Sequence, residues 1–187
     1  MAIRFRLRMV LGAAAMLAAT GCAGPHYLGY APQPGAGRGD GDDGFASAML
    51  ALHNGERVRL GLEPMQWDPT LAAASDGYAG TLAATGIFRH SARSTRQGQG
   101  ENLWTGTRGA FGHHQMVGGW LGEKPLYQPG VFPNVSRNGN WAAVGHYTQI
   151  IWRGTTNVGC AVRSSMAFDY LVCRYSPPGN IFGKTVS

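Results

Sequence analysis

The order in which helical and strand patterns follow one another constrains the fold of this chain most. Apolar residues recur at helical spacing over residues 45–52. Asp68 followed by Pro69 has the form of a second helix start, and Gly86 is predicted to end that helix. The last third of the chain carries β-branched and aromatic runs separated by turn residues, which predict strands at 147–152, 158–162 and 170–175. Helices first and strands last predict an α+β domain built from packed layers.

Two cysteines lie within the last two predicted strands. Those strands are expected to pair as a hairpin, which would bring Cys160 and Cys173 together. Two cysteines that flank a short loop are expected to form a disulfide in an oxidising compartment. Two buried free thiols are the alternative.

A third helix is predicted over residues 110–123, and a long loop follows it at 125–140. In the helix, Met116, Trp120 and Glu123 form one stripe at i, i+4 and i+7. Loops as long as this one are usually functional or mobile inside a compact domain. Its apolar side chains would either cover a lipid or pin the loop to the domain, and we favour the second: Leu126, Tyr127, Val131, Phe132 and Val135.

The N-terminus has the form of an export signal. Three arginines precede an apolar run over residues 9–19, which is too short to span a bilayer, and small residues then lead to Cys22. We therefore predict a lipoprotein-type signal peptide over 1–22 that ends at an acylated Cys22. A flexible linker rich in Gly and Pro at 23–44 and one folded domain at 45–187 would follow. Secretion without an anchor is the alternative.

The charge of the chain argues against nucleic acid as a partner. The formal net charge is +6, and removal of Arg4, Arg6 and Arg8 with the leader leaves +3, with no basic run in the remainder. The expected membrane contact is the lipid anchor. Ala23 after the cysteine is not an acidic retention signal, so an outer membrane, where there is one, is the favoured location.

Several segments together resemble the CAP superfamily, which comprises cysteine-rich secretory proteins, antigen 5 and pathogenesis-related 1 proteins. They occur in family order across nearly all of residues 45–187, and the match is greatest to the plant pathogenesis-related type. The segments are Leu52-His53-Asn54 with Arg57, Pro64 to Asp68, His90-Ser91, Gly100 to Trp104, Trp120 with Glu123-Lys124, Gly145 to Trp152, Val158 to Ala161 and Cys173 to Asn180.

The resemblance implies an α-β-α sandwich, with an antiparallel sheet between helical layers. It also implies a cleft lined by a tetrad of two histidines and two acids, which by motif are His90, Glu101, Glu123 and His146. The plant proteins usually have three disulfides and a Cys before their Gly-His-Tyr motif. Val144 stands at that position here, so only the bridge between Cys160 and Cys173 is expected.

The tetrad residues have chemistry suited to a divalent metal. Neutral imidazoles are good ligands for Zn²⁺, so His90 and His146 are the predicted metal ligands, binding reversibly. Glu101 and Glu123 would ligate, orient the histidines or take a proton from a bound water, and they are the candidate catalytic residues if the protein is an enzyme. The alternative is a buried network in which the four side chains satisfy one another without a metal.

The remaining polar residues of the motifs have structural interpretations. His53 on the first predicted helix is interpreted as a hydrogen-bonded structural histidine, and Ser91 as a hydrogen-bonding support for the site. Neither the G-x-S-x-G nor the H-E-x-x-H pattern of hydrolases occurs in the chain.

The resemblance specifies the fold better than a reaction. We therefore favour a non-catalytic binding or interaction module over an enzyme, with a hydrophobic small molecule, a divalent metal or a protein as partner. A metal-dependent, peptidase-like hydrolase that uses the tetrad is the alternative. A surface protein that acts through partners, with a purely structural tetrad, is a third possibility.

Overall fold

The computed structural model describes residues 42–96 and 98–187, all of which belong to one compact unit of the chain, Ala31–Ser187. The predicted leader, Cys22 and most of the predicted linker lie outside the described residues. In the part that is described, no helix has the length and apolarity that crossing a bilayer requires. The first helix, α1 (Asp42–Arg59), begins three residues before the predicted start of the domain at Phe45.

A four-stranded sheet of order β1-β3-β4-β2 forms the middle of the domain. The strands β3 (Asn157–Ser164) and β4 (Phe168–Ser176) form the predicted antiparallel hairpin, and β2 (Gly100–Thr107) pairs with β4, also antiparallel. A short parallel pairing adds β1 (Gln66–Trp67) next to β3. Cys160 lies directly opposite Cys173 in the hairpin and forms the predicted disulfide with it.

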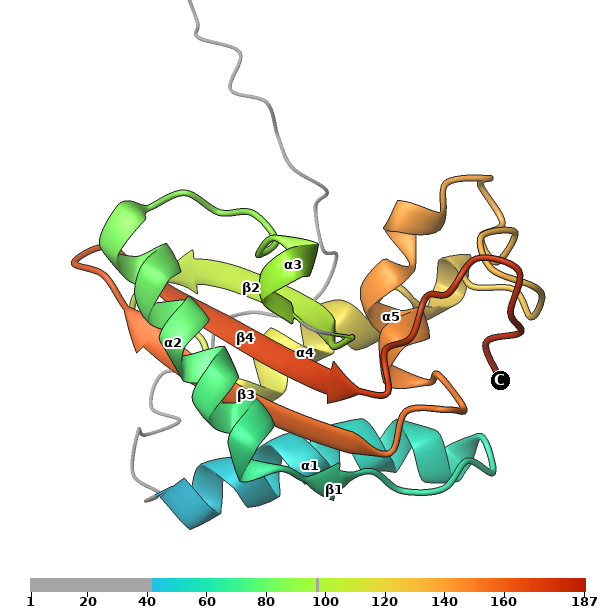
Figure 1. Ribbon diagram of the computed structural model, residues 1–187, viewed down its shortest axis with the longest axis horizontal. Helices are drawn as coiled ribbons and strands as arrows, with labels where there is room; N and C mark the ends of the chain where they lie inside the picture. The colour runs from blue at the N-terminus through green and yellow to red at the C-terminus, as the bar shows by residue number, and fades with distance from the viewer. Residues whose placement is uncertain (1–41, 97) are drawn as a thin grey trace, which may run out of the picture. The chain divides into compact units, whose positions relative to one another are not determined.

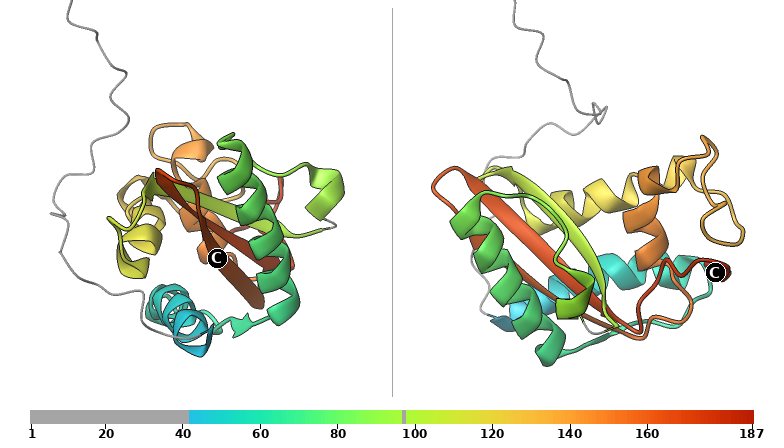
Figure 2. Two further views of the ribbon diagram at one scale, coloured as in Figure 1. Left: turned by 90° about the vertical axis from the view of Figure 1, so that its left-hand side faces the viewer. Right: turned by 45° about the horizontal axis from the view of Figure 1, so that its top comes forward.

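Helices cover both faces of this sheet (Figures 1 and 2). The helix α2 (Pro69–Thr85) packs on one face, and the short helix α3 (Arg93–Arg96) follows it along the chain. On the other face lie α1, α4 (His113–Leu121) and α5 (Gly145–Ile150). Two short 3-10 helices flank the long loop: Lys124–Leu126 lies at its start and Trp141–Ala143 directly after its end. The α-β-α layers implied by the resemblance are therefore confirmed.

The core consists of two apolar clusters, one on each face of the sheet. The smaller cluster joins Ala79 and Leu82 of α2 to Leu103 and Val172. The larger cluster contains buried residues of α1, α4 and α5 packed against β3 and β4: Met49, Met116, Trp120, Ile150, Val158, Cys160, Cys173 and Tyr175 among others. Successive strand residues point to opposite faces, so one strand serves both clusters.

Local signals in the sequence explain the position of α2. The side chain of Asp68 accepts hydrogen bonds from the backbone N of Thr70 and Leu71, which satisfies the free N–H groups of the first turn. Gly86 ends the helix with φ 68°, a left-handed conformation that glycine adopts without a steric penalty. Both ends were predicted, and both are confirmed.

A buried arginine fastens α1 to the loop that follows α5. Arg57 is 1% exposed and donates from Nη1 to the carbonyl oxygens of Ile150 and Trp152, at 2.8 and 2.9 Å. Its Nη2 donates to the carbonyl of Thr155 at 3.0 Å, and its Nε to that of Glu63 at 2.8 Å. Burial lowers the pKa of Arg57, but the four carbonyl acceptors replace the water that its guanidinium loses.

Two predictions of secondary structure are corrected. Residues 147–152 were predicted as a strand, but residues 145–150 form α5, which is buried along most of its length. A short, fully buried apolar run has the same pattern in a helix as in a strand, so periodicity could not separate them. The strand β2 had no counterpart among the predicted elements.

Candidate functional site

His90 and Glu101 form the first pair of the predicted tetrad. Glu101 lies on β2, and its Oε1 accepts from His90 Nδ1 at 2.8 Å and from the backbone N of Ser91 at 3.0 Å. Its Oε2 accepts from Ser91 Oγ at 2.8 Å and forms an ion pair with Arg174 Nη2, 3.1 Å away, which donates to Ser91 Oγ. Ser91 therefore has the predicted supporting role, and Arg174, opposite Glu101 on β4, supplies a buried counter-charge.

The environment keeps Glu101 ionised. Burial alone would raise the pKa of Glu101, but the hydrogen bond from His90, the charge of Arg174 and the bonds from Ser91 outweigh it and lower the pKa. An ionised carboxylate only accepts hydrogen bonds, so neutral His90 carries its proton on Nδ1 and leaves Nε2 as an acceptor or ligand atom. The side chain of His90 is 54% exposed, which makes that atom available to a partner.

Glu123 and His146 form the second pair. His146 Nδ1 lies 2.5 Å from Glu123 Oε1, and Glu123 Oε2 accepts from the backbone N of His146 and of Tyr147 at 3.0 Å each. Glu123 thus binds the first turn of α5, where free N–H groups favour a negative charge. The imidazole of His146 also stacks on Trp120, with ring centroids 5.9 Å apart.

A buried polar chain connects the second pair to α1. Asn102, one residue along β2 from Glu101, donates from Nδ2 to the carbonyl of His146 at 3.1 Å and to the Tyr175 hydroxyl at 3.2 Å. That hydroxyl lies 2.9 Å from His53 Nε2, and His53 Nδ1 lies 2.7 Å from the carbonyl of Met49. His53 therefore donates from Nδ1 and accepts at Nε2 from Tyr175, and its predicted structural role is confirmed. Burial lowers the pKa of His53 to about 4.

The four tetrad residues meet as two pairs and not as one cluster of ligand atoms. In residues 42–96 and 98–187, only His53, Cys160 and Cys173 place three potential ligand atoms within 4.8 Å of one another. The two cysteines are joined in the disulfide and both nitrogens of His53 are hydrogen-bonded, so this group is not a metal site in the oxidised protein. Within the tetrad, Nε2 of His90 and Nε2 of His146 are the ring nitrogens that the His–Glu pairs leave for a metal.

A groove of about 790 Å³ lies beside the first pair, between α2 and the chain that follows it. We call it the α2 groove. Among the described residues that line it none is acidic, and three are Arg89, His90 and Arg174. The other lining residues are apolar or uncharged: Ala74, Gly77, Tyr78, Thr81, Leu82, Thr85, Ile87, Ser91, Ala92 and Thr95. The centroid of the Tyr78 ring lies 5.6 Å from the Arg174 guanidinium carbon.

Two guanidinium groups near the groove have an unused donor. Arg174 Nε and Arg96 Nε are buried, and neither has a hydrogen-bond partner among the described residues. The charge of Arg96 also contributes to lowering the pKa of Arg174, after burial as the main cause, so the two groups interact. Positive charge therefore exceeds negative charge at this end of the groove.

The role of Arg174 as the buried counter-charge of Glu101 was not predicted from the sequence. One signal was present, because Arg174 interrupts an otherwise apolar and aromatic run, Tyr170 to Tyr175, that predicts a buried strand. A charged residue inside such a strand requires a buried partner. That partner is Glu101, which the sequence had placed in the tetrad without a buried cation beside it.

The sandwich of layers is the fold that the resemblance to the CAP superfamily implies. The chain belongs to this family, because the model of the cysteine-rich secretory protein family, CAP, matches residues 50–175. Among curated relatives, pathogenesis-related protein 1C of Nicotiana tabacum is 38% identical over 138 residues, which cover 73% of this chain and 77% of that protein. Pathogenesis-related protein 1 of Arabidopsis thaliana is 37% identical over 129 residues, which cover 68% of this chain and 73% of that protein.

Solved structures show the same fold. The crystal structure of NaASP2 with Zn²⁺ matches with a TM-score of 0.66 at 24% identity, over 81% of this chain and 89% of that one. The crystal structure of MpPR-1i matches with a TM-score of 0.52 at 21% identity, over 74% and 91% of the two chains. At these identities the likeness concerns the fold alone.

Proposed function

We propose that this chain is an exported binding module that takes a small amphiphilic molecule with an acidic head group in the α2 groove. Membership of a family of secretory proteins and the N-terminal signal pattern both support export. The groove has a volume in the range of small-molecule sites and combines apolar walls with a few convergent polar groups. The proposal therefore assigns the binding role to a defined part of the fold.

One observation supports the proposed chemical class of the ligand, an acidic head group with an apolar tail. The lining residues of the α2 groove include two arginines and a histidine but no carboxylate, next to apolar Leu82 and Ile87. Guanidinium groups bind carboxylates and phosphates strongly, and apolar walls bind an alkyl or aryl tail. The acidic head is expected at Arg89, with the tail along Leu82 and Ile87.

A binding measurement with matched ligands tests this function. We expect dodecanoate to bind residues 31–187 in calorimetry, and the alcohol of equal length to bind at least ten-fold more weakly. Ile87→Glu places a like charge in the groove and should abolish dodecanoate binding. Val58→Glu, at a similarly exposed position on α1, should not. Equal affinity for acid and alcohol, or full binding by Ile87→Glu, would remove the α2 groove as the site.

Metal-dependent hydrolysis is a second candidate, favoured by the orientation of the two histidines. In each pair a carboxylate holds Nδ1 and leaves Nε2 available, and histidines that ligate Zn²⁺ are usually held by a carboxylate in this way. A bound ion would lower the pKa of a water molecule and polarise a carbonyl group. Glu101 and Glu123 would orient the imidazoles. Catalytic zinc sites usually have three protein ligands, and the two His–Glu pairs leave only two imidazole nitrogens of the tetrad for a metal, so we favour the binding module.

Native mass spectrometry with added zinc separates the two candidates. A zinc adduct that is lost in His90→Ala/His146→Ala, together with chelator-sensitive peptidase activity, would support the hydrolase. A zinc adduct without activity would make the pairs a binding site only. Absence of any zinc adduct would leave the pairs a structural network and remove the hydrolase.

We also propose that Cys22 carries the lipid anchor. The support is the sequence pattern of small residues before the cysteine. The test is the intact mass of the exported full chain from a bacterial host. An acylated N-terminal cysteine, absent from Cys22→Ala, is expected, whereas a free N-terminus beyond Cys22 would show secretion without an anchor.

A further inference from the structure

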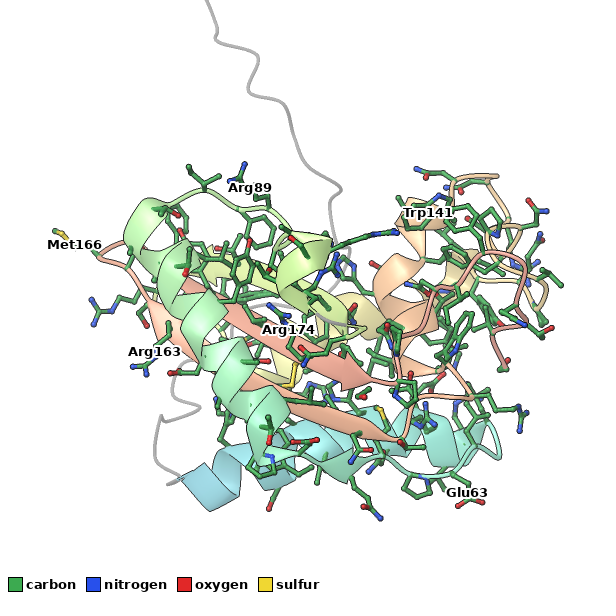
Figure 3. The ribbon with its side chains drawn as sticks, in the orientation of Figure 1. Glu63, Arg89, Trp141, Arg163, Met166 and Arg174 are labelled. Atoms are coloured by element: carbon green, nitrogen blue, oxygen red, sulfur yellow. A yellow bond between two sulfur atoms is a disulfide. The ribbon has the colours of Figure 1, made fainter. Side chains whose placement is uncertain are left out.

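Four exposed apolar side chains gather at one end of the domain. Val131 is 48% exposed, Trp141 40%, Ile181 42% and Phe182 62%. We call this set the aromatic end. It combines the long loop, the second 3-10 helix and the C-terminal segment, and Figure 3 labels Trp141 there, far from Met166 at the other end of the sheet. None of the four belongs to the tetrad or lines the α2 groove.

A buried ring holds the aromatic end together. Phe132 is 1% exposed, and its ring centroid lies 5.2 Å from that of Trp141 and 5.2 Å from that of Phe182. The backbones are also joined, since Phe132 N donates to the carbonyl of Lys184 at 2.9 Å and Gly183 N to that of Phe132 at 2.8 Å. The exposed side chains therefore stand on a packed support, and little ordering is needed before they bind.

The charged side chains in the segments that build the aromatic end are basic. Arg137 and Lys184 are exposed there, and exposed Arg153 adjoins the C-terminal segment, because its backbone N donates to the carbonyl of Val186 at 2.8 Å. After Glu123 the sequence has a single acid, Asp169, which is 1% exposed and lies on β4 in the hairpin of Met166. A protruding set of aromatic and aliphatic side chains with basic neighbours complements a surface that is apolar inside and anionic outside.

We propose that the aromatic end docks this domain onto an anionic lipid bilayer. Trp141 and Phe182 would lie at the level of the head groups, where aromatic rings are favoured, with Arg137 and Lys184 on the phosphates. A second copy of the chain fits less well, because two such surfaces would bring like charges together. Four partly exposed side chains also offer roughly a few hundred Å², less than the ~800 Å² per partner of a stable interface. The inference is independent of the α2 groove and of Cys22.

Vesicle co-sedimentation of residues 31–187 tests the docking without the predicted lipid anchor. We expect binding to vesicles of phosphatidylcholine with 30% phosphatidylglycerol, and at least five-fold less binding to pure phosphatidylcholine or at 0.5 M salt. Trp141→Ser/Phe182→Ser should reduce binding at least five-fold. Met166→Ser/Phe168→Ser removes apolar groups that are 95% and 47% exposed at the other end, and should bind as the unaltered domain does.

A charge variant covers the case in which the aromatic variant folds poorly. Arg137→Glu/Lys184→Glu changes only exposed side chains and should abolish binding to the anionic vesicles while the melting temperature stays within a few degrees. Unchanged binding in both variants would overturn the proposal, as would absence of binding by the unaltered domain. A concentration-dependent dimer that is lost in Trp141→Ser/Phe182→Ser, without vesicle binding, would assign the surface to a second copy instead.

Discussion

Arg174 Nη2 lies 3.1 Å from Glu101 Oε2, and the two side chains are 4% and 0% exposed. This ion pair joins β4 to β2 and carries the carboxylate that orients His90. The site and the sheet therefore share one buried interaction, and a change in either residue acts on both.

Removal of the cation should be costly. Arg174→Met leaves the Glu101 carboxylate buried with only His90 and Ser91 as partners, and we expect a loss of about 3 kcal/mol in the free energy of unfolding. Urea denaturation would measure it. Arg163→Met, which breaks the exposed pair with Asp76, is the control and should cost under about 1 kcal/mol. Equal losses in the two variants would mean that burial does not determine the strength of these pairs.

The buried His53 should make stability depend on pH. Burial lowers its pKa from 6.5 to about 4, so between these values the unfolded chain holds a proton that the folded protein lacks. Unfolding then takes up a proton, and stability falls as the pH decreases from about 6.5 to about 4, by about 3 kcal/mol in total. His53→Gln should lose this dependence, as measured by unfolding at pH 4, 5, 6 and 7. A parallel pH profile in the variant would contradict it.

Phe132 should be required for stability rather than for gating a lipid. Its side chain is buried against Trp141, Trp152 and Phe182 and so attaches the long loop to the domain. This is the role that the sequence analysis favoured for the apolar loop residues. Phe132→Ala should cost about 3–5 kcal/mol, seen as a lower melting temperature. Phe88→Ala, at a ring that is 47% exposed, is the matched control and should cost under about 1 kcal/mol. A stable Phe132→Ala domain with reduced lipid uptake would restore the gating interpretation.

The two carboxylates should fix the tautomer of the site histidines. Glu101 and Glu123 each accept from Nδ1, so neutral His90 and His146 should both carry their proton there. Nitrogen NMR of the imidazoles at neutral pH distinguishes the tautomers. Glu123→Ala should shift His146 toward the Nε2 form and leave His90 unchanged. A predominant Nε2 tautomer in the unaltered protein would contradict the geometry.

The sequence predicted those parts of the fold that local chemistry determines. The Asp68 cap, the Gly86 stop and the hairpin with its disulfide follow from residues close in the chain or from a strong pairing pattern. The α5 helix did not follow, because burial on all sides removes the periodicity that identifies a helix. The tetrad came from motifs, and spacing alone had not gathered residues so far apart in the chain.

The division of the tetrad into two pairs was also beyond the sequence. It depends on β2, whose successive residues Glu101 and Asn102 point to opposite faces of the sheet. Glu101 contacts His90 and Arg174 on one face. On the other face, the side-chain amide of Asn102 donates to the backbone carbonyl of His146. The partner of Arg174 is a residue more than seventy positions earlier, which only the strand register reveals.

Within residues 42–96 and 98–187, Arg57 donates to four carbonyl oxygens and to no side chain. Every amino acid carries a carbonyl, so residues 63, 150, 152 and 155 can change identity without removing an acceptor. No other residue type offers the same five donors in one plane at position 57. The side chains at the acceptor positions thus contribute nothing to this junction, whereas Arg57 has no substitute, and in a survey of variants the exposed Glu63 should tolerate replacement while Arg57 should not.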